Sequence, residues 1–329
     1  MPPDADPPRS PGAVSDGFAL VTEDLDRHLA AIQRLLAAAE EVVGGPVVDE
    51  SEQERLRSLA AGACRPATWR SALLRRHGED VAYLGLVLPD GTRSRAITGD
   101  LALRRGRPDL AQVTAVALEA VPDLARGVQA VTAQVWLRAV GPAERAGIDA
   151  AGGTVTRELR ILERPLPAVD PAGRDALAHL HAAGGRIRSF RPGEDDVEVV
   201  AILREAYAGT ADGGWDHHRL AERLRYDWFD PEDLLVAEDG DGHLLGLHWL
   251  KHRGGREGEV YNLAVHPRAQ GRRVGPALLQ AGLDHLSGTG CEVVVLWVDA
   301  ANERAVRLYE RHGFTVRSTD VAVAIDLVA

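Results

Sequence analysis

Two residues in the second half of the chain have the side chains and the settings that proton transfer requires. Glu259 begins the apolar stretch EVYNLAV, and Tyr309 stands in the middle of ERAVRLYER. The two-residue alternation of a strand would place Glu259 on one face with Tyr261, Leu263 and Val265. The carboxylate is a candidate base and the phenol a candidate acid. The structural alternatives are an exposed charge at a strand end and a core aromatic.

A basic loop follows this strand and opens a helix. It lies in HPRAQGRRVGPALL, residues 266–279, where Arg272 and Arg273 stand between two glycines. N–H groups at a helix N-terminus and the helix dipole favour an anion, and glycine lets a phosphate approach the backbone. The GKS or GKT of a P-loop is missing. The loop alone is equally consistent with a pyrophosphate-binding site and with a solvated basic turn.

The segment NERAVRLYERHGF, residues 302–314, predicts a short amphipathic helix. Asn302 is a good N-cap and Gly313 suits the C-terminus. The whole order is strand, proline, basic glycine loop, helix, strand, asparagine, and then A-x-x-x-Y-x-x-x-G-F. This order is more specific than any of its parts.

Helical and strand-like patterns alternate along the chain, which predicts a mixed α/β protein. We expect helices at 22–43, 50–62, 109–120, 174–183, 195–207, 216–226, 274–287 and within 302–314. We expect strands at 81–88, 95–103, 130–137, 155–163, 234–238, 243–252, 258–265, 293–298 and 321–327.

Three prolines in ERPLPAVDPAG, residues 163–173, disfavour a continuous helix or strand and indicate a connection between domains. The expected organisation is therefore a disordered tail at 1–17, a first domain at 18–166, a linker at 167–185 and a second domain at 186–329.

The two halves also resemble each other at a nearly constant spacing. Trp136 and Trp297 are 161 positions apart, and so are Gly152 and Gly313. The motif DLAL at 100–103 matches NLAV after 162 positions. Matches in the same order across successive blocks favour a duplicated domain over chance.

The duplication indicates which half carries the chemistry. Ile97 matches Glu259, and Ile148 matches Tyr309. The stretch that matches the basic loop, residues 108–113, has no glycine. We expect the reaction in the second half, with the first half as a scaffold or lid.

Composition limits the partners. The net charge of −11 over 329 residues argues against non-specific binding to nucleic acid. Cys64 and Cys291 stand alone, which is typical of a reducing cytoplasm, and Cys291 reads as a buried strand residue. We see no signal-peptide core, no membrane-length apolar run and no zinc-like histidine spacing, so we expect no membrane and no metal.

The order of motifs resembles the GNAT superfamily of acyl-CoA-dependent N-acyltransferases. The resemblance implies two tandem GNAT-like α/β domains, each with a mixed, mostly antiparallel sheet flanked by helices. A splayed strand pair in the second would admit acetyl-CoA, the co-substrate. Glu259 is implied as the general base, and Tyr309 as the acid that protonates the CoA sulfur. Cofactor contacts are implied for Leu263, Ala264, Val265, Gln270, Gly271, Arg272, Arg273, Val274, Gly275, Asn302 and Arg307.

Further blocks resemble the mycothiol synthases, a tandem branch of that family. These blocks are GGW, WFDP, LLGLHWLK and GEVY, within residues 213–261. The resemblance implies acetylation of the cysteinyl amine of a mycothiol precursor. It implies acceptor contacts for Lys251, Glu259, Asp212 and Trp297. We expect a cytoplasmic monomer whose partners are acetyl-CoA and a small-molecule amine.

The sequence departs from the family pattern at three positions. Arg273 takes the first glycine position of the loop, and Pro276 removes an N–H group. Asp212 stands where the branch has a glutamate nearby. Two alternatives therefore stay open. One is a GNAT enzyme for another amine, such as an aminoglycoside-type sugar or a protein N-terminus, and the other is a catalytically weak acyl-CoA-binding regulatory protein.

Overall fold

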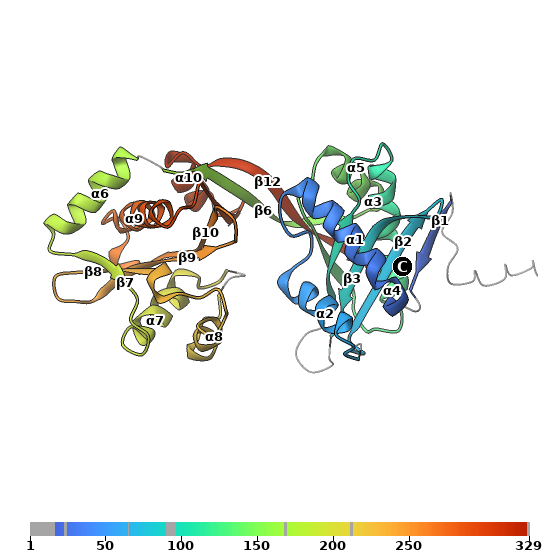
Figure 1. The fold of residues 1–329 in the computed structure, drawn as a ribbon, viewed down its shortest axis with the longest axis horizontal. Coiled ribbons are helices and arrows are strands. Elements are labelled where there is room, and N and C mark those ends of the chain that lie inside the picture. The colour runs from blue at the N-terminus through green and yellow to red at the C-terminus, as the bar shows by residue number, and fades with distance from the viewer. Residues whose placement is uncertain are drawn as a thin grey trace, which may run out of the picture. The chain divides into compact units, whose positions relative to one another are not determined.

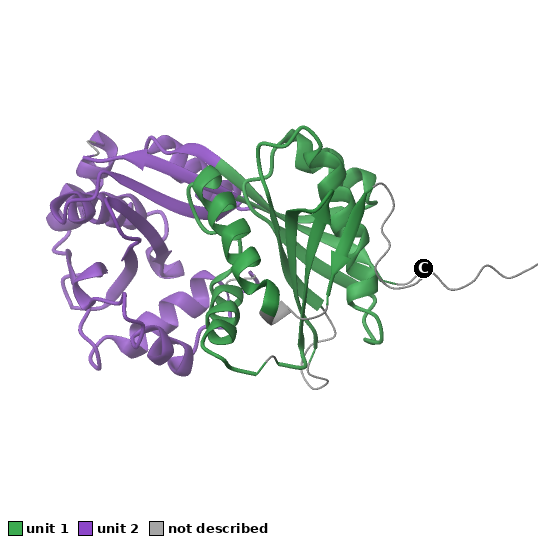
Figure 2. Cartoon of the chain, turned by 45° about the vertical axis from the view of Figure 1, so that its right-hand side comes forward, with its two compact units in different colours: residues 1–159, 318–329 green, residues 160–317 purple. Residues whose placement is uncertain are grey.

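A computed structural model describes residues 17–22, 25–64, 66–89, 97–167, 170–210 and 213–327. The chain forms two compact units (Figure 2). Unit 1 holds residues 1–159 and 318–329, and unit 2 holds residues 160–317. The expected tail lies almost wholly outside the described residues, and the expected domain limits stay a prediction.

Unit 1 is a sheet with helices on both faces (Figure 1). Its elements are β1 (Phe18–Val21), α1 (Leu25–Val43), α2 (Glu50–Ala60), β2 (Trp69–Arg76), β3 (Glu79–Val87), β4 (Ile97–Leu103), α3 (Leu110–Glu119), α4 (Val121–Leu124), β5 (Thr132–Leu137), α5 (Pro142–Ala150) and the start of β6 (Thr154–Pro165). The strand order is β1-β2-β3-β4-β5-β12. The β4–β5 pair is parallel, and the other pairs in this order are antiparallel.

Unit 2 repeats this design. Its elements are the end of β6, α6 (Pro171–Ala182), β7 (Arg186–Ser189), α7 (Asp196–Ala206), α8 (His217–Arg223), the 3₁₀ turn η1 (Pro231–Asp233), β8 (Leu234–Glu238), β9 (Leu244–His252), β10 (Glu257–Val265), the turn η2 (Pro267–Ala269), α9 (Val274–Gly288), β11 (Val293–Asp299), α10 (Glu303–Arg311) and the start of β12 (Thr315–Asp326). The strand order is β11-β10-β9-β8-β7, and again one pair, β10–β11, is parallel. The mixed, mostly antiparallel sheets agree with the predicted fold class.

The repeat seen in the sequence is also present in the elements. Helices α5 and α10 begin 161 positions apart, and strands β6 and β12 begin and end 161 positions apart. Strands β5 and β11 begin at the same spacing. One strand–helix–strand module therefore occurs twice.

Strand β12 does not stay within unit 2. Its residues Val321–Asp326 pair antiparallel with Leu137–Thr132 of β5. Val321 and Val323 are fully buried in the core of unit 1. The end of the chain thus completes the sheet of the first unit.

Strand β2 was not predicted, because arginines interrupt its apolar pattern. Arg75 pairs with Asp80 at 2.7 Å, and Arg76 pairs with Asp109, so charged side chains accompany a strand whose middle is buried. Strands β1 and β7 and helices α4 and α5 were missed as well. Strand β12 begins at Thr315, earlier than the expected 321, because its first residues are polar and partly exposed.

The core of unit 2 lies on both faces of β9 and β10. Leu279, Leu283 and Leu286 of α9 pack with Leu250 on one face. Helices α7 and α8 cover the other face (Figure 1). Burial of each such leucine contributes about 1.5–3 kcal/mol. This packing fixes α9 against the strands from which the site is built.

Candidate active site

Strands β10 and β11 separate partway along their length. Glu257–Glu259 pair with Val293–Val295, and beyond these residues the register between the two strands ends, although both continue. The matching pair in unit 1 stays together over Ile97–Leu101 and Ala133–Leu137. In the described residues of unit 2 the edge of β10 beyond Glu259 is therefore not covered by β11, as the predicted splayed pair requires.

A bulge marks the same point on the other side of β10. The register with β9 shifts between Val260 and Asn262, which leaves Tyr261 as the extra residue. Bulges bend a strand and turn its side chains. The bulge changes the alternation that the sequence predicted, so Glu259 and Leu263 no longer follow one uninterrupted pattern.

A cleft of about 490 Å³ lies along the free end of β10. It is lined by the end of α7, by β10, by the loop and first turn of α9, and by α10. It brings together every predicted cofactor residue except Arg272, which is exposed and outside the lining. The roles of these residues stay predictions.

The first turn of α9 faces this cleft. Val274 and Gly275 line it, and their N–H groups have no acceptor within the helix because they belong to the first turn. Pro276 supplies no N–H group. Arg273 caps the helix at φ +61°, a left-handed conformation that costs a non-glycine residue roughly 1–2 kcal/mol.

The cleft is electropositive although the protein is acidic. Arg273, Arg304, Arg307 and Arg311 line it, and its described lining contains no aspartate or glutamate. Arg304 donates to Gln270 Oε1 at 2.9 Å, which links α10 to the loop. Together with the helix N-terminus, these groups suit a polyanion such as a pyrophosphate.

Tyr309 lies at the wall of the cleft and is 8% exposed. Burial, with a smaller contribution from Tyr207, raises the pKa of its phenol far above the usual value, so the phenol is neutral at physiological pH. Its ring meets Phe314 edge-on, with centroids 5.5 Å apart. Tyr207, which also lines the cleft and donates to Leu263 O at 3.5 Å, was not predicted.

Asn302 caps helix α10 and also borders the cleft. Its Oδ1 accepts from Ala305 N at 3.1 Å, which is the N-cap that the sequence offered as the structural alternative. The residue also lines the cleft.

Glu259 lies outside the lining of this cleft. It is 8% exposed, and its Oε2 accepts from Arg253 Nη1 at 2.7 Å. Lys251 stands opposite it on β9 in the sheet register. Arg253 was not singled out from the sequence, because no motif links it to Glu259.

Two of the predicted acceptor residues, Lys251 and Trp297, make cation–π contacts. Lys251 Nζ lies 4.6 Å from the centre of the Trp228 ring. Trp297 is 37% exposed and lies under the guanidinium of Arg253, 4.8 Å from Cζ to the ring centre. Asp212 lies outside the described residues.

His248 and Trp249 of β9 are core residues in this structure. Both are fully buried. Burial lowers the pKa of His248 to about 4, and its Nδ1 lies 2.8 Å from Leu278 O. Trp249 packs among aromatic rings, including that of Trp215.

Cys291 is buried just before β11, and burial raises the pKa of its thiol. In the part of the chain that the structure describes, one group of possible metal ligands comes together, Asp239, Asp241 and His243 on the β8–β9 turn. The expectation of no metal stays a prediction. No helix in the described ranges is long and apolar enough to cross a membrane.

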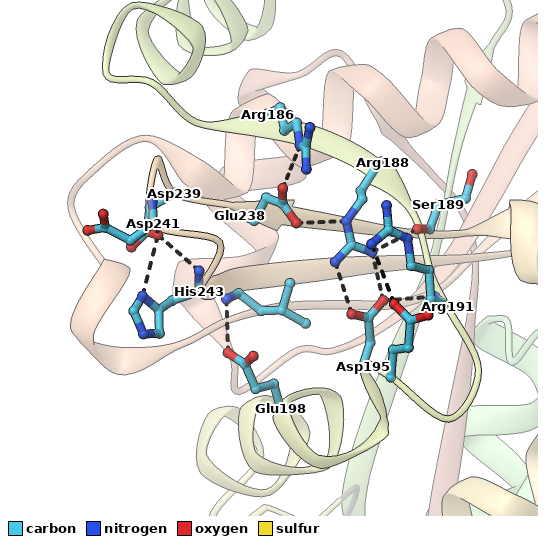
Figure 3. A network of polar contacts seen from close by, with 12 residues as sticks. Arg186, Arg188, Ser189, Arg191, Asp195, Glu198, Glu238, Asp239, Asp241 and His243 are labelled. Carbon is cyan, nitrogen blue, oxygen red and sulfur yellow. Dashed lines mark hydrogen bonds and ion pairs between the residues drawn. The ribbon is translucent and has the colours of Figure 1, made fainter.

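Arg188 anchors helix α7, whose end lines the cleft. Figure 3 shows its contacts with Asp195 and Glu238. It donates to both oxygens of Asp195 at 2.7 and 2.9 Å and to Glu238 at 2.7 Å. Asp195 is the N-cap residue of α7, and Glu238 ends β8. One guanidinium thus ties strand β7 to the next strand and to the start of α7.

Sequence comparison agrees with this geometry. Residues 198–314 match the acetyltransferase (GNAT) family. A mycothiol acetyltransferase of Sanguibacter keddieii is 36% identical over 304 residues, which cover 89% of this chain and 92% of that protein. One from Actinosynnema mirum is 36% identical over 302 residues, with 89% and 94% covered. One from Stackebrandtia nassauensis is 43% identical over 192 residues, which are 57% of this chain and 61% of the relative.

Solved structures agree at the level of the fold. A GCN5-related N-acetyltransferase from Sphaerobacter thermophilus superposes with a TM-score of 0.67 at 23% identity and covers 96% of this chain and 98% of its own. A tandem GNAT protein from the clavulanic acid biosynthesis pathway gives 0.61 at 18% identity, with 95% and 98% covered. The chain therefore belongs to the GNAT family and is a tandem GNAT N-acetyltransferase that resembles the mycothiol acetyltransferases.

Proposed function

We propose that this enzyme transfers an acetyl group from acetyl-CoA to the cysteinyl amine of a mycothiol precursor. The observation that carries the acetyl-CoA part is the electropositive cleft at the separation of β10 from β11, which Tyr309 borders. The names of the relatives support the choice of acceptor. Two proteins named mycothiol acetyltransferase are each 36% identical to this chain over 89% of its length.

The residues of the cleft fit an acyl-CoA. The backbone of Leu263–Val265, at the free edge of β10, would bind the pantetheine amides. The N–H groups of Val274 and Gly275, with Arg273, would hold the diphosphate. The thioester supplies the acetyl group and the leaving thiolate.

Two side chains divide the proton transfers. Glu259 accepts the proton of the attacking amine, which must be neutral to act as a nucleophile. Tyr309, kept neutral by burial, donates a proton to the departing thiolate. Since the amine attacks the thioester directly, neither residue forms a covalent intermediate, and much of the rate comes from alignment of the two reactants.

The test is thiol release from acetyl-CoA with cysteinyl-glucosaminyl-inositol as acceptor. We expect acceptor-dependent turnover that falls by about 10²–10⁴-fold in Glu259→Gln. Glu310→Gln is the matched control, because Glu310 is an exposed residue of α10 and lies outside the cleft lining.

Other outcomes separate the alternatives. Turnover with an aminoglycoside or a peptide N-terminus, but not with this acceptor, would reassign the substrate. Acetyl-CoA binding without turnover on any amine would favour a regulatory protein.

A further inference from the structure

Arg253 joins three segments of unit 2 around the proposed base. It follows β9 directly, and its side chain is 20% exposed. Its Nη1 donates to Glu259 at 2.7 Å, and its Nε lies 3.2 Å from Glu257 Oε1. Its Cζ lies 4.8 Å from the centre of the Trp297 ring on β11.

We propose that Arg253 positions Glu259 and also determines acceptor specificity, by selecting amines that carry a single positive charge over polycations. The inference rests on the proposed function, because it takes Glu259 as the base that meets the acceptor.

The positioning follows from the number of independent contacts. The backbone N–H of Arg253 donates to Glu257 O at 3.0 Å, which closes the β9–β10 hairpin. Glu257 is held from its other side by Arg317 at 2.7 Å. The guanidinium is planar and lies over Trp297, so few of its orientations remain once the ring is in place. A donor fixed in this way holds the Glu259 carboxylate in one orientation, and small displacements of a base slow proton transfer strongly.

The specificity follows from charge. Three cations and two carboxylates meet around Arg253. Arg253 is bonded to Glu259 and Glu257, and Arg317 binds the other oxygen of Glu257. Lys251 stands opposite Glu259 in the register. An acceptor with one ammonium group loses that charge as Glu259 takes its proton. Each further ammonium of a polyamine stays charged and is repelled by Arg253. For two extra charges several ångströms away in water, this repulsion lowers kcat/KM by about a factor of ten.

The experiment compares two acceptors in the full-length enzyme with acetyl-CoA. The acceptors are cysteinyl-glucosaminyl-inositol, which carries one amine, and spermidine, which carries three. We expect Arg253→Gln to lower kcat for the single amine by at least about tenfold and to reduce the discrimination against spermidine in kcat/KM by about tenfold. Arg253→Lys keeps the positive charge but loses the planar group with several fixed N–H donors. We therefore expect kcat to fall while the discrimination against spermidine stays unchanged.

The matched control is Arg256→Gln in the same hairpin. Arg256 is 69% exposed and pairs with Glu292 at 2.6 Å, so its loss should change neither kcat nor discrimination. Unchanged discrimination in Arg253→Gln would overturn the proposal. If that variant does not fold, Arg253→Lys decides: wild-type kcat in this variant would overturn the positioning role.

Failure of the proposed function has a different signature. If the wild type does not acetylate the cysteinyl acceptor but does acetylate glucosamine, the proposed substrate is wrong. The ratio of kcat/KM for glucosamine to kcat/KM for spermidine, compared between the wild type and Arg253→Gln, then still tests the inference. If the wild type acetylates none of these amines, both proposals fail.

Discussion

At the scale of single residues, the burial of Tyr309 decides its chemistry. A phenol in water loses its proton near pH 10, whereas burial raises the pKa of Tyr309 above that value. A proton donor must be protonated to act. The raised pKa therefore keeps Tyr309 competent as an acid through the whole neutral and mildly alkaline range.

The pH dependence of turnover tests this argument. We expect no alkaline loss of kcat attributable to Tyr309 below pH 10, and we expect Tyr309→Phe to lower kcat about 10²–10⁴-fold at every pH up to that value. The measurement is kcat for thiol release between pH 6 and 10. An alkaline limb centred near pH 8 that disappears in Tyr309→Phe would contradict the assignment.

The sequence pointed to Glu259, Tyr309 and the basic loop because each has a distinctive residue type or a motif around it. It did not point to Arg253 or Tyr207. Their importance comes from partners on other elements, Glu259 and Trp297 for Arg253 and Leu263 for Tyr207. No local pattern records such long-range pairs.

At the scale of elements, the largely buried guanidinium of Arg188 holds the start of α7 against two strands. The Arg188 side chain is 17% exposed, and its partners Asp195 and Glu238 are 9% and 5% exposed. The paired charges lower the pKa of both carboxyl groups and raise that of Arg188, although burial opposes these shifts.

Removing this guanidinium would leave two carboxylates buried without their main partner. We expect Arg188→Met to lower the free energy of unfolding of unit 2 by about 3 kcal/mol. Arg186→Met is the control, because Arg186 binds the same Glu238 but is 66% exposed, so its loss should cost about 1 kcal/mol or less. Urea unfolding followed by tryptophan fluorescence measures both, and equal losses would refute the argument.

The predictability of the elements follows from the same physics. Strands β8, β9, β10 and β11 were predicted well because they are apolar and bounded by turns. Strand β2 was hidden because Arg75 and Arg76 are neutralised by Asp80 and Asp109, which the sequence does not place beside them. The pairing of β12 with β5 of unit 1 could not be predicted, since no local signal indicates which strand an apolar segment will pair with.

At the scale of the whole molecule, unit 1 depends on the end of the chain. We expect removal of residues 321–329 to leave β5 with an unpaired edge and to expose the core around Val135 and Leu137. Hydrogen exchange of the β5 amides should then accelerate far more than exchange in β9, which pairs only with β8 and β10 among the described strands. Equal acceleration in the two strands, or none in β5, would contradict this dependence.

The placement of β12 also bears on how the protein is made. A ribosome releases the chain from its N-terminus, and domains generally fold in that order as they emerge. Here the strand segment that closes the first sheet is synthesised after every residue of unit 2. The nascent first unit must wait, with the edge of β5 open, until β12 has been synthesised. The half that is made first can therefore finish folding only after the second half has been made.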